Sequence, residues 1–170
     1  MIRKFGFAAL AAAWLATPAL AAEKLTVETS EGCSFDIALR PDLAPKHVAQ
    51  ISKLAKSGFY DGIVFHRVIK DFMAQTGDPT GTGRGGSSEP DLPAEFSKEH
   101  YVRGTVGMAR TQDPNSANSQ FFIMFAEGGF LDGQYTVWGQ VDEAGMACVD
   151  KIKLGEPPVN PDKMVKVTVH

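Results

Sequence analysis

Two segments near the start of the chain alternate between apolar and polar residues. Segments 25–29 and 33–39 each place an apolar side chain at every second position. Successive side chains of a strand point to opposite faces of a sheet, so each segment predicts a strand with one buried face. Glu31 and Gly32 lie between the two segments, and we therefore expect a β-hairpin.

A helical spacing follows the hairpin. Pro45 suits the first position of a helix, and Gly58 suits its end. Between them, Val48 and Ile51 fall on one helical face, which should cover a hydrophobic opening. The same spacing predicts a second helix over residues 145–153.

The other apolar segments are short and are separated by turn residues. Segments 64–69 and 72–75 are apolar at both parities, so both of their faces should be covered. Residues 77–93 are rich in glycine, serine and proline and predict a long ordered loop. Further strands are predicted at 105–109, 120–125, 136–141 and 165–169.

These patterns amount to about eight strands and two helices. Short strands separated by turns, without the alternation of strands and helices typical of a parallel sheet, indicate a mainly β fold. Closing an antiparallel sheet into a barrel removes its exposed edges. We therefore expect one mainly β domain at 22–170. With 44% hydrophobic and 22% charged residues, the chain has the composition of an ordinary globular protein.

The glycine-rich part of the long loop formally fits a dinucleotide-binding motif. Residues 81–86 read G-T-G-R-G-G, which matches G-x-G-x-x-G. That motif requires a strand before it and a helix after it. Pro90 and Pro93 follow too closely for a helix to begin there, so we reject this interpretation.

The N-terminus has the layout of a secretory signal peptide. Arg3 and Lys4 precede an apolar run over residues 5–16, and small residues at 19–21 suit a cleavage site. The alternative is a membrane anchor, but the run is shorter than the roughly 20 residues that a spanning helix needs. We expect residues 1–21 to be removed and the mature domain to be exported, with no membrane association afterwards.

The charge of the mature chain argues against a nucleic-acid partner. Without Arg3 and Lys4, 15 basic and 20 acidic residues remain, a formal charge of −5. An acidic domain without a basic stripe is a poor ligand for nucleic acid. We therefore expect no nucleic-acid binding.

Cys33 and Cys148 lie far apart in the sequence, and the sequence leaves their state open. An oxidising compartment would permit a disulfide between them. Their apolar neighbours equally suit buried free cysteines, and this alternative is favoured because no Cα separation can be read from sequence.

Residues 64–75 carry the candidate chemistry. One arginine, Arg67, stands close to Gln75 and to the apolar Phe72 and Met73, without a serine or thiol nucleophile. Because successive side chains of a strand point to opposite faces, Arg67 can share a surface with Met73 and Gln75 of the next strand. A guanidinium beside an apolar floor is suited to gripping and polarising a peptide backbone.

These residues also carry a family resemblance. F-H-R-V-I at 65–69 followed by F-M-x-Q at 72–75 resembles the signature of the cyclophilins, which are peptidyl-prolyl cis-trans isomerases. Two later stretches resemble the same family in the same order, and the resemblance covers roughly residues 25–169. The first runs from G-M-A-R at 107–110 to S-Q-F-F-I at 119–123, and the second is F-L-D-G at 130–133.

The resemblance implies a closed eight-stranded antiparallel barrel with a filled core and a helix over each end, so that the site lies on its outer wall. It implies that Arg67 donates a hydrogen bond to the prolyl nitrogen, while Gln75 and Gln120 orient the peptide or the arginine. No metal or cofactor is implied. The implied substrate-binding residues are Phe72, Met73, Gly81, Thr82, Gly83, Ala109, Arg110, Phe122, Phe130, Leu131 and Tyr135.

Further expectations concern the partners and the setting. Phe130 and Tyr135 stand where many eukaryotic members carry tryptophan and histidine, which resembles bacterial exported members and implies a periplasmic location. The implied partners are proline-containing peptides and unfolded protein clients, and the protein is expected to be a monomer. His66 has the opposite parity to Arg67 and is expected to point away from the site.

Two other functions compete with an isomerase. A non-catalytic module that binds proline-containing segments as a chaperone would use the same groove. Such a module needs only the pocket, so the combination of Arg67, Gln75 and Gln120 favours the enzyme. A hydrolase is disfavoured, because no nucleophile and base motif is found.

Overall fold

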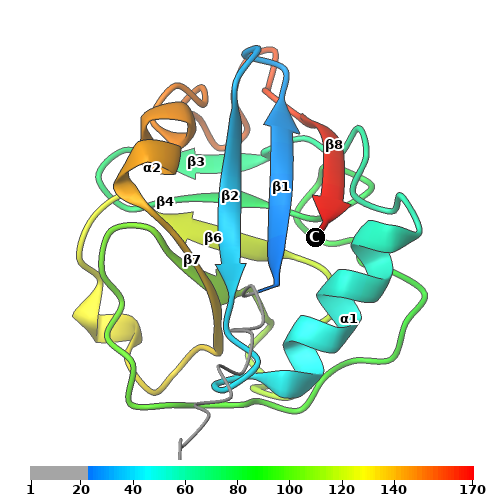
Figure 1. Cartoon of the computed structure of the whole chain (residues 1–170), viewed down its shortest axis with the longest axis vertical. Helices are drawn as coiled ribbons and strands as arrows, with labels where there is room; N and C mark the ends of the chain where they lie inside the picture. The colour runs from blue at the N-terminus through cyan, green and yellow to red at the C-terminus, as the bar shows by residue number, and fades with distance from the viewer. Residues whose placement is uncertain (1–22) are drawn as a thin grey trace, which may run out of the picture.

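The computed structural model describes residues 23–170, and the signal peptide predicted at 1–21 lies outside the described residues. Figure 1 shows the arrangement of the elements. In chain order these are β1 (Lys24–Thr29), β2 (Ser34–Leu39), α1 (Pro45–Lys56), β3 (Arg67–Ile69), β4 (Met73–Thr76), β5 (Thr105–Met108), β6 (Phe121–Met124), the 3₁₀ helix η1 (Gly129–Leu131), β7 (Val137–Val141), α2 (Glu143–Val149) and β8 (Met164–Val169).

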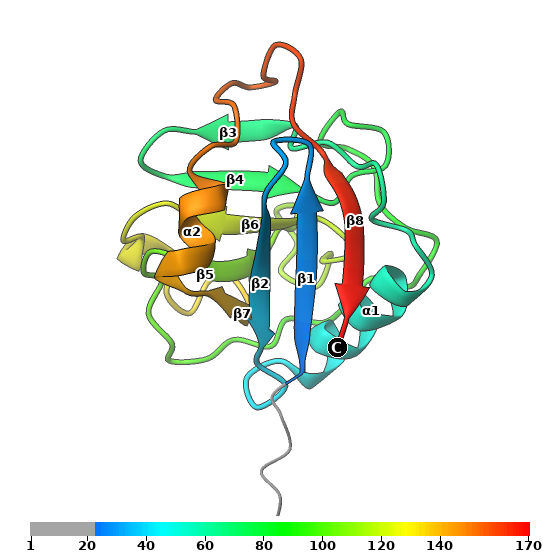
Figure 2. The ribbon, with the colours of Figure 1, turned by 45° about the horizontal axis from the view of Figure 1, so that its top comes forward.

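The eight strands form one antiparallel sheet with the order β3-β4-β6-β5-β7-β2-β1-β8. The sheet curls strongly, so that β1, β2 and β8 run across the direction of β3, β4 and β6 (Figure 1 and Figure 2). The prediction of a mainly β fold with eight antiparallel strands and two helices is confirmed.

The closed barrel is not confirmed, because β3 and β8 remain the two ends of the ladder. Backbone hydrogen bonds do connect the segment before β3 with the start of β8. The Phe65 amide donates to the Asp162 carbonyl (2.8 Å), and the Met164 amide donates to the Ile63 carbonyl (2.9 Å). The sheet is therefore a curled half-barrel whose ends touch through irregular backbone.

The concave side of the sheet holds the main hydrophobic core. In the predicted hairpin, Leu25 pairs with Ile37 and Val27 pairs with Phe35, and all four side chains are buried. Trp138 on β7 is fully buried with them. The alternation of apolar residues thus predicted both the hairpin and its buried face.

The two helices lie at opposite ends of the curled sheet (Figure 1). Helix α1 begins at Pro45, as predicted, and packs against β7 and β8. Helix α2 packs against β2, but it covers Glu143–Val149 rather than the predicted 145–153. The carboxylate of Asp142 accepts a hydrogen bond from the Gly145 amide (2.7 Å), and this cap fixes the earlier start. No helix within residues 23–170 has the length and apolar character needed to cross a lipid bilayer.

Strand β3 is shorter than the predicted strand at 64–69. Only Val64 makes an isolated bridge before it, and Asp71 adopts a positive φ of 58° in the turn that ends it. Phe72 therefore precedes β4 instead of belonging to it. This placement removes the conflict of parity between Phe72 and Met73, because only Met73 must obey the alternation of the strand.

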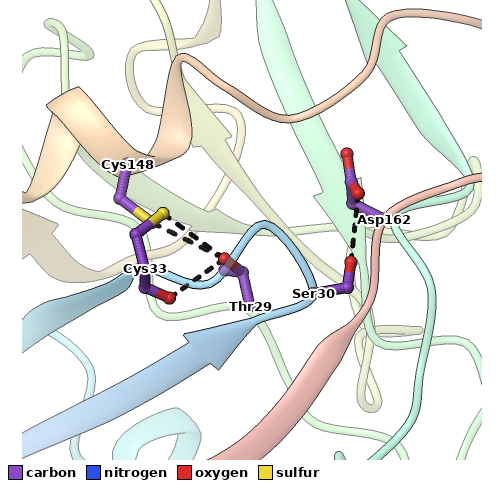
Figure 3. Close-up of a disulfide and its surroundings, with 5 residues drawn as sticks. All are labelled: Thr29, Ser30, Cys33, Cys148 and Asp162. Carbon is purple, nitrogen blue, oxygen red and sulfur yellow. Dashed lines mark hydrogen bonds between the residues drawn. A yellow bond between two sulfur atoms is a disulfide. The ribbon is translucent and has the colours of Figure 1, made fainter.

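The prediction that favoured free cysteines is wrong. Cys33 and Cys148 form a disulfide with a Cα–Cα distance of 5.9 Å, which joins the β1–β2 turn to α2 (Figure 3). The hydroxyl of Thr29 donates to the Cys33 carbonyl (3.0 Å) beside the bridge. Sequence separation of 115 residues concealed this pairing, because only the curl of the sheet brings the two elements together.

Candidate active site

The candidate site is built on the outer face of the sheet, which we define as the face of β3, β4, β5 and β6 turned away from the main core. Strand register aligns its residues, since Arg67 pairs with Gln75 and Gln75 pairs with Phe122. Gly107 lies opposite Phe122 on β5, and a Cβ there would come within 2.6 Å of the phenyl ring. The small residue at 107 therefore lets the ring lie close against the sheet.

A second apolar cluster covers this outer face. It is separate from the main core, and Phe122 is only 6% exposed within it. The Phe122 ring stacks on Tyr101 with 5.8 Å between ring centroids. The buried members of this outer cluster are Met73, Tyr101, Phe122, Met124, Leu131 and Val137.

A cavity of about 300 Å³ opens over this cluster. Its floor is apolar and its edge carries the Arg67 guanidinium, so that it combines the two features expected of the site. Most predicted site residues meet here. The lining residues are His66, Arg67, Phe72, Met73, Gln75, Gly83, Ala109, Arg110, Phe122, Leu131 and Tyr135.

Aromatic residues form the rim of the cavity. Phe130 is 70% exposed and lies 5.6 Å from Phe72 between ring centroids, above the floor and outside the lining set. Tyr135 lies edge-on to Phe122 (5.8 Å), and the Arg110 guanidinium lies 4.5 Å from the Tyr135 ring centroid. Part of the predicted contact surface is thus an exposed rim.

A chain of side-chain hydrogen bonds runs along the cavity wall. Arg67 Nη1 donates a long bond to Gln75 Oε1 (3.5 Å), and Gln75 Nε2 donates to Gln120 Oε1 (3.0 Å). Gln120 Nε2 then donates to the carbonyls of Gly83 (3.1 Å) and Gly85 (2.8 Å). The three predicted catalytic side chains therefore form one connected unit that ends on the glycine-rich loop.

One contact of Arg67 was not predicted. Its Nε donates to Glu156 Oε1 at 2.8 Å, from a loop 89 positions further along the chain. No sequence pattern indicates this contact, because an exposed glutamate after a helix is common and has no characteristic spacing from Arg67.

The comparisons with known proteins agree with this geometry. A family model described as cyclophilin type peptidyl-prolyl cis-trans isomerase/CLD matches residues 24–169. The chain belongs to the cyclophilin family. A protein of Brucella suis named probable peptidyl-prolyl cis-trans isomerase is 61% identical over 148 residues, covering 78% of this chain and 75% of that protein. Peptidyl-prolyl cis-trans isomerase-like 1 of Aspergillus oryzae is 39% identical over 159 residues, covering 87% and 96%.

Solved structures share the cyclophilin fold as well. The cyclophilin AquaCyp293 of Hirschia baltica has a TM-score of 0.75 at 32% identity, covering 85% of this chain and 73% of that one. A cyclophilin-type isomerase of Cryptosporidium parvum, crystallised in the presence of the dipeptide Ala-Pro, has a TM-score of 0.79 at 28% identity, covering 86% and 98%. The chain is thus a cyclophilin-type peptidyl-prolyl cis-trans isomerase, a family that works without a cofactor. Within residues 23–170, no group of three or more His, Cys, Asp or Glu residues is placed to hold a metal ion.

In this cyclophilin a single carboxylate organises the glycine-rich loop. Asp78 accepts hydrogen bonds from the backbone amides of Thr80 (2.7 Å), Thr82 (3.1 Å), Gly83 (2.6 Å) and Gly85 (3.1 Å). Burial alone would raise the pKa of Asp78, but the bonds from Thr80, Gly85 and Gly83 outweigh it and lower the pKa to about 2. The carboxylate therefore stays ionised and holds the loop against the sheet.

The three predicted loop residues differ in their position relative to the cavity. Gly83 lines the cavity, whereas Gly81 and Thr82 line neither this cavity nor the one beside it. Thr82 is bound to Asp78, and a Cβ at Gly81 would lie 3.2 Å from Val64. Of the three residues predicted to flank the groove, only Gly83 lines the cavity, because the loop turns back onto Asp78 at Gly81 and Thr82.

The expectation that His66 points away from the site is wrong. His66 lines the cavity although its parity opposes that of Arg67, because residue 66 precedes β3 and does not follow the strand alternation. It is 6% exposed, and neither ring nitrogen has a hydrogen-bond partner within the described residues. Burial lowers the pKa of His66, Asp78 opposes this and Arg67 adds to it, so that the imidazole is neutral at pH 7.

A second cavity of about 530 Å³ adjoins the first and shares Gln75, Gly83, Ala109 and Arg110 with it. Asn118 shapes this second cavity by accepting a hydrogen bond from the Ser87 amide (2.8 Å). Apart from Gln120, the residues that this second cavity does not share with the first were not predicted as site residues. The additional lining residues are Arg84, Gly85, Gly86, Ser87, Asp91, Thr111, Ser116, Asn118, Ser119 and Gln120.

Proposed function

We propose that Arg67 accelerates rotation about Xaa-Pro bonds by donating a hydrogen bond to the prolyl nitrogen. The observation that carries this proposal is the position of its guanidinium at the edge of an apolar cavity. Nε and Nη1 are engaged by protein acceptors, while Nη2 has no hydrogen-bond partner within residues 23–170. Nη2 is thus a charged donor available to a ligand in the cavity.

The chemistry of the amide explains why a donor is sufficient. Rotation of a prolyl peptide bond has a barrier of about 20 kcal/mol, because the planar amide is conjugated. At the twisted transition state the nitrogen lone pair is localised and becomes a hydrogen-bond acceptor. A donor aimed at that nitrogen stabilises the transition state more than either planar ground state, which accelerates the reaction.

The apolar floor has a separate task. Met73, Phe122 and Leu131 offer a buried surface on which a pyrrolidine ring can rest. Holding the ring fixes one side of the amide while the acyl side rotates. Excluding water around the ring also strengthens the hydrogen bond from Arg67, because the local dielectric constant falls.

We assign the peptide backbone of the substrate to the edge formed by Ala109 and Arg110. The Ala109 amide already donates to the Gln120 carbonyl (2.9 Å), so that its own carbonyl is the backbone group left for a substrate amide. The second cavity continues from this edge and can receive side chains that precede the proline. Phe130 and Tyr135 would close over the ring from the rim.

We further propose that this cyclophilin is a monomeric bacterial exported form that acts on unfolded or flexible clients in the periplasm. The signal-peptide pattern at 1–21 supports export. The Cys33–Cys148 disulfide supports an oxidising compartment. Mass spectrometry of the protein from its native envelope should find an N-terminus near Ala22, without membrane association. Intact Met1 in the membrane fraction would contradict cleavage and favour a membrane anchor.

The backbone bonds between segments 62–65 and 162–164 support a barrel that is effectively closed in solution. Hydrogen exchange tests this proposal through the amides of Phe65 and Met164. Protection comparable to that of β4 amides would support closure, and rapid exchange would show an open edge.

Replacing Arg67 tests the catalytic proposal. A charge-assisted hydrogen bond contributes about 1.5–3 kcal/mol, so Arg67→Ala should lower kcat/KM by roughly ten- to a hundredfold. A protease-coupled assay on a proline tetrapeptide measures this. The melting temperature should change little, because the Arg67 side chain is 42% exposed. Unchanged catalysis in a folded Arg67→Ala protein would leave a non-catalytic proline-segment chaperone as the better interpretation.

A further inference from the structure

The shortest hydrogen bond of the Arg67 guanidinium is made to a residue outside the cavity. Glu156 Oε1 accepts from Nε at 2.8 Å, whereas Gln75 Oε1 accepts from Nη1 at 3.5 Å. Glu156 does not line either cavity. It therefore contacts the arginine from outside both cavities.

The backbone fixes the carboxylate beside the arginine. Gly155 and Val68 exchange two hydrogen bonds, with the Val68 amide donating at 2.8 Å and the Gly155 amide donating at 2.9 Å. Gly155 directly precedes Glu156, and Val68 directly follows Arg67. A Cβ at residue 155 would lie 2.5 Å from Pro158 Cα, so that only glycine allows this close approach.

Glu156 belongs to the loop of residues 153–162, and the far end of this loop, at Asp162, is also anchored. Asp162 is 2% exposed and accepts from the Lys153 amide (2.9 Å) and from Lys153 Nζ (2.9 Å). The Ser30 hydroxyl donates to Asp162 Oδ1 (3.0 Å; Figure 3), the oxygen that also accepts from Lys153 Nζ. Both ends of the loop are thus tied down, and Glu156 is held on a constrained backbone.

We propose that Glu156 is a positioning residue that fixes the plane of the Arg67 guanidinium, so that Nη2 is directed at the prolyl nitrogen. This inference rests on the catalytic role proposed for Arg67. A half-exposed arginine has several accessible rotamers, and a single long bond to Gln75 does not select one of them. Two acceptors on Nε and Nη1 define the plane of the rigid guanidinium fork.

The contact is suited to orientation rather than to stability. The side chains of Arg67 and Glu156 are 42% and 53% exposed, and ion pairs of this kind add little to folding. Orientation of a catalytic group, in contrast, acts directly on the rate. Loss of Glu156 should therefore lower kcat while KM and the melting temperature stay nearly constant.

The test compares Glu156→Ala, Glu156→Gln and a control, Glu143→Ala. Glu143 accepts a hydrogen bond from Arg103 Nε at 3.0 Å, as Glu156 does from Arg67 Nε. Neither Glu143 nor Arg103 lines a cavity of the site. We expect Glu156→Ala to lower kcat about three- to tenfold at unchanged KM. Glu156→Gln keeps the acceptor oxygen and should recover most of the rate. Glu143→Ala should leave the rate unchanged.

A double variant separates this inference from the catalytic proposal. If Glu156 acts through the guanidinium, Glu156→Ala should have no further effect on kcat in an Arg67→Ala background. An unchanged kcat in Glu156→Ala, with catalysis still lost in Arg67→Ala, would overturn the positioning role and leave the catalytic role intact. Equal rates in wild type and in Arg67→Ala would overturn the catalytic role itself. A rise in KM alone in Glu156→Ala would also contradict positioning.

Discussion

Strand β6 presents its two faces to two different environments. Phe121 and Ile123 point into the main core, while Phe122 and Met124 belong to the cluster on the outer face. All four residues are buried and apolar, so their chemistry is nearly the same. The inner face is enclosed by the curled sheet, whereas the outer face is closed only by side chains at a rim. A catalytic surface thus needs an apolar face that the fold leaves without a complete cover.

The two faces also differ in the polar side chains that they carry. Arg67 and Gln75 lie beside Phe122 on the outer face, and their polar ends reach solvent or protein acceptors at the cavity edge. The core has no comparable edge where a guanidinium could be solvated, and an unpaired charge there would be costly. Substitutions on the two faces should therefore separate stability from catalysis.

The largest effect on stability is expected from Phe121→Ala. Phe121 makes edge-to-face contacts with Tyr60 (5.7 Å) and Trp138 (5.3 Å) in the core. Truncation of a buried phenylalanine costs about 3–5 kcal/mol in the free energy of unfolding, which urea denaturation can measure. The folded fraction should keep its kcat/KM. Phe122→Ala should lose less stability and more activity, and equal losses in both variants would remove the distinction between the two faces.

The disulfide is expected to act on stability alone. It closes 115 residues between Cys33 and Cys148, neither of which lines a cavity. Removing a native disulfide typically costs about 2–5 kcal/mol, so the double serine variant should unfold at distinctly lower urea concentration. At temperatures where it remains folded, its isomerase rate should match wild type. A rate that falls in proportion to stability would show that the bridge also supports the outer face.

A smaller effect on stability is expected from replacing Asp78, whose carboxylate holds the glycine-rich loop. Its pKa of about 2 lies below the usual 3.8, so the folded state binds fewer protons than the unfolded state. The resulting stabilisation is present above pH 4 and is lost as the pH falls toward 2. Asp78→Asn should remove about 2 kcal/mol at pH 7 and almost nothing at pH 2. Unfolding curves at both pH values measure this, and an equal loss at both would contradict the assigned cause.

The sequence predicted elements whose signal is local. The hairpin, the start of α1 and the common surface of Arg67 and Gln75 depend on alternation and turn residues, which act over a few positions. The prediction for His66 failed because parity holds only inside a regular strand, and residue 66 lies outside β3. The early start of α2 could have been found from Asp142, a favourable capping residue.

Long-range contacts could not be predicted in this way. Glu156 reaches Arg67 across 89 positions, and Cys33 reaches Cys148 across 115. Both contacts depend on how the sheet curls, which no pattern of neighbouring residues specifies. Family resemblance located Arg67, Gln75 and Gln120 but did not indicate what else touches the arginine.

The order of strands in the sheet has a consequence for synthesis of the chain. Strand β1 lies between β2 and β8, and Val27 pairs with Val167 across 140 positions. A ribosome that has made only the hairpin leaves one edge of β1 without its neighbour until residue 169 has emerged. Nascent chains of intermediate length therefore carry an unsatisfied strand edge, which is a template for intermolecular pairing. Such partial chains should depend on binding factors that shield the edge, whereas the completed polypeptide shields it with its own β8.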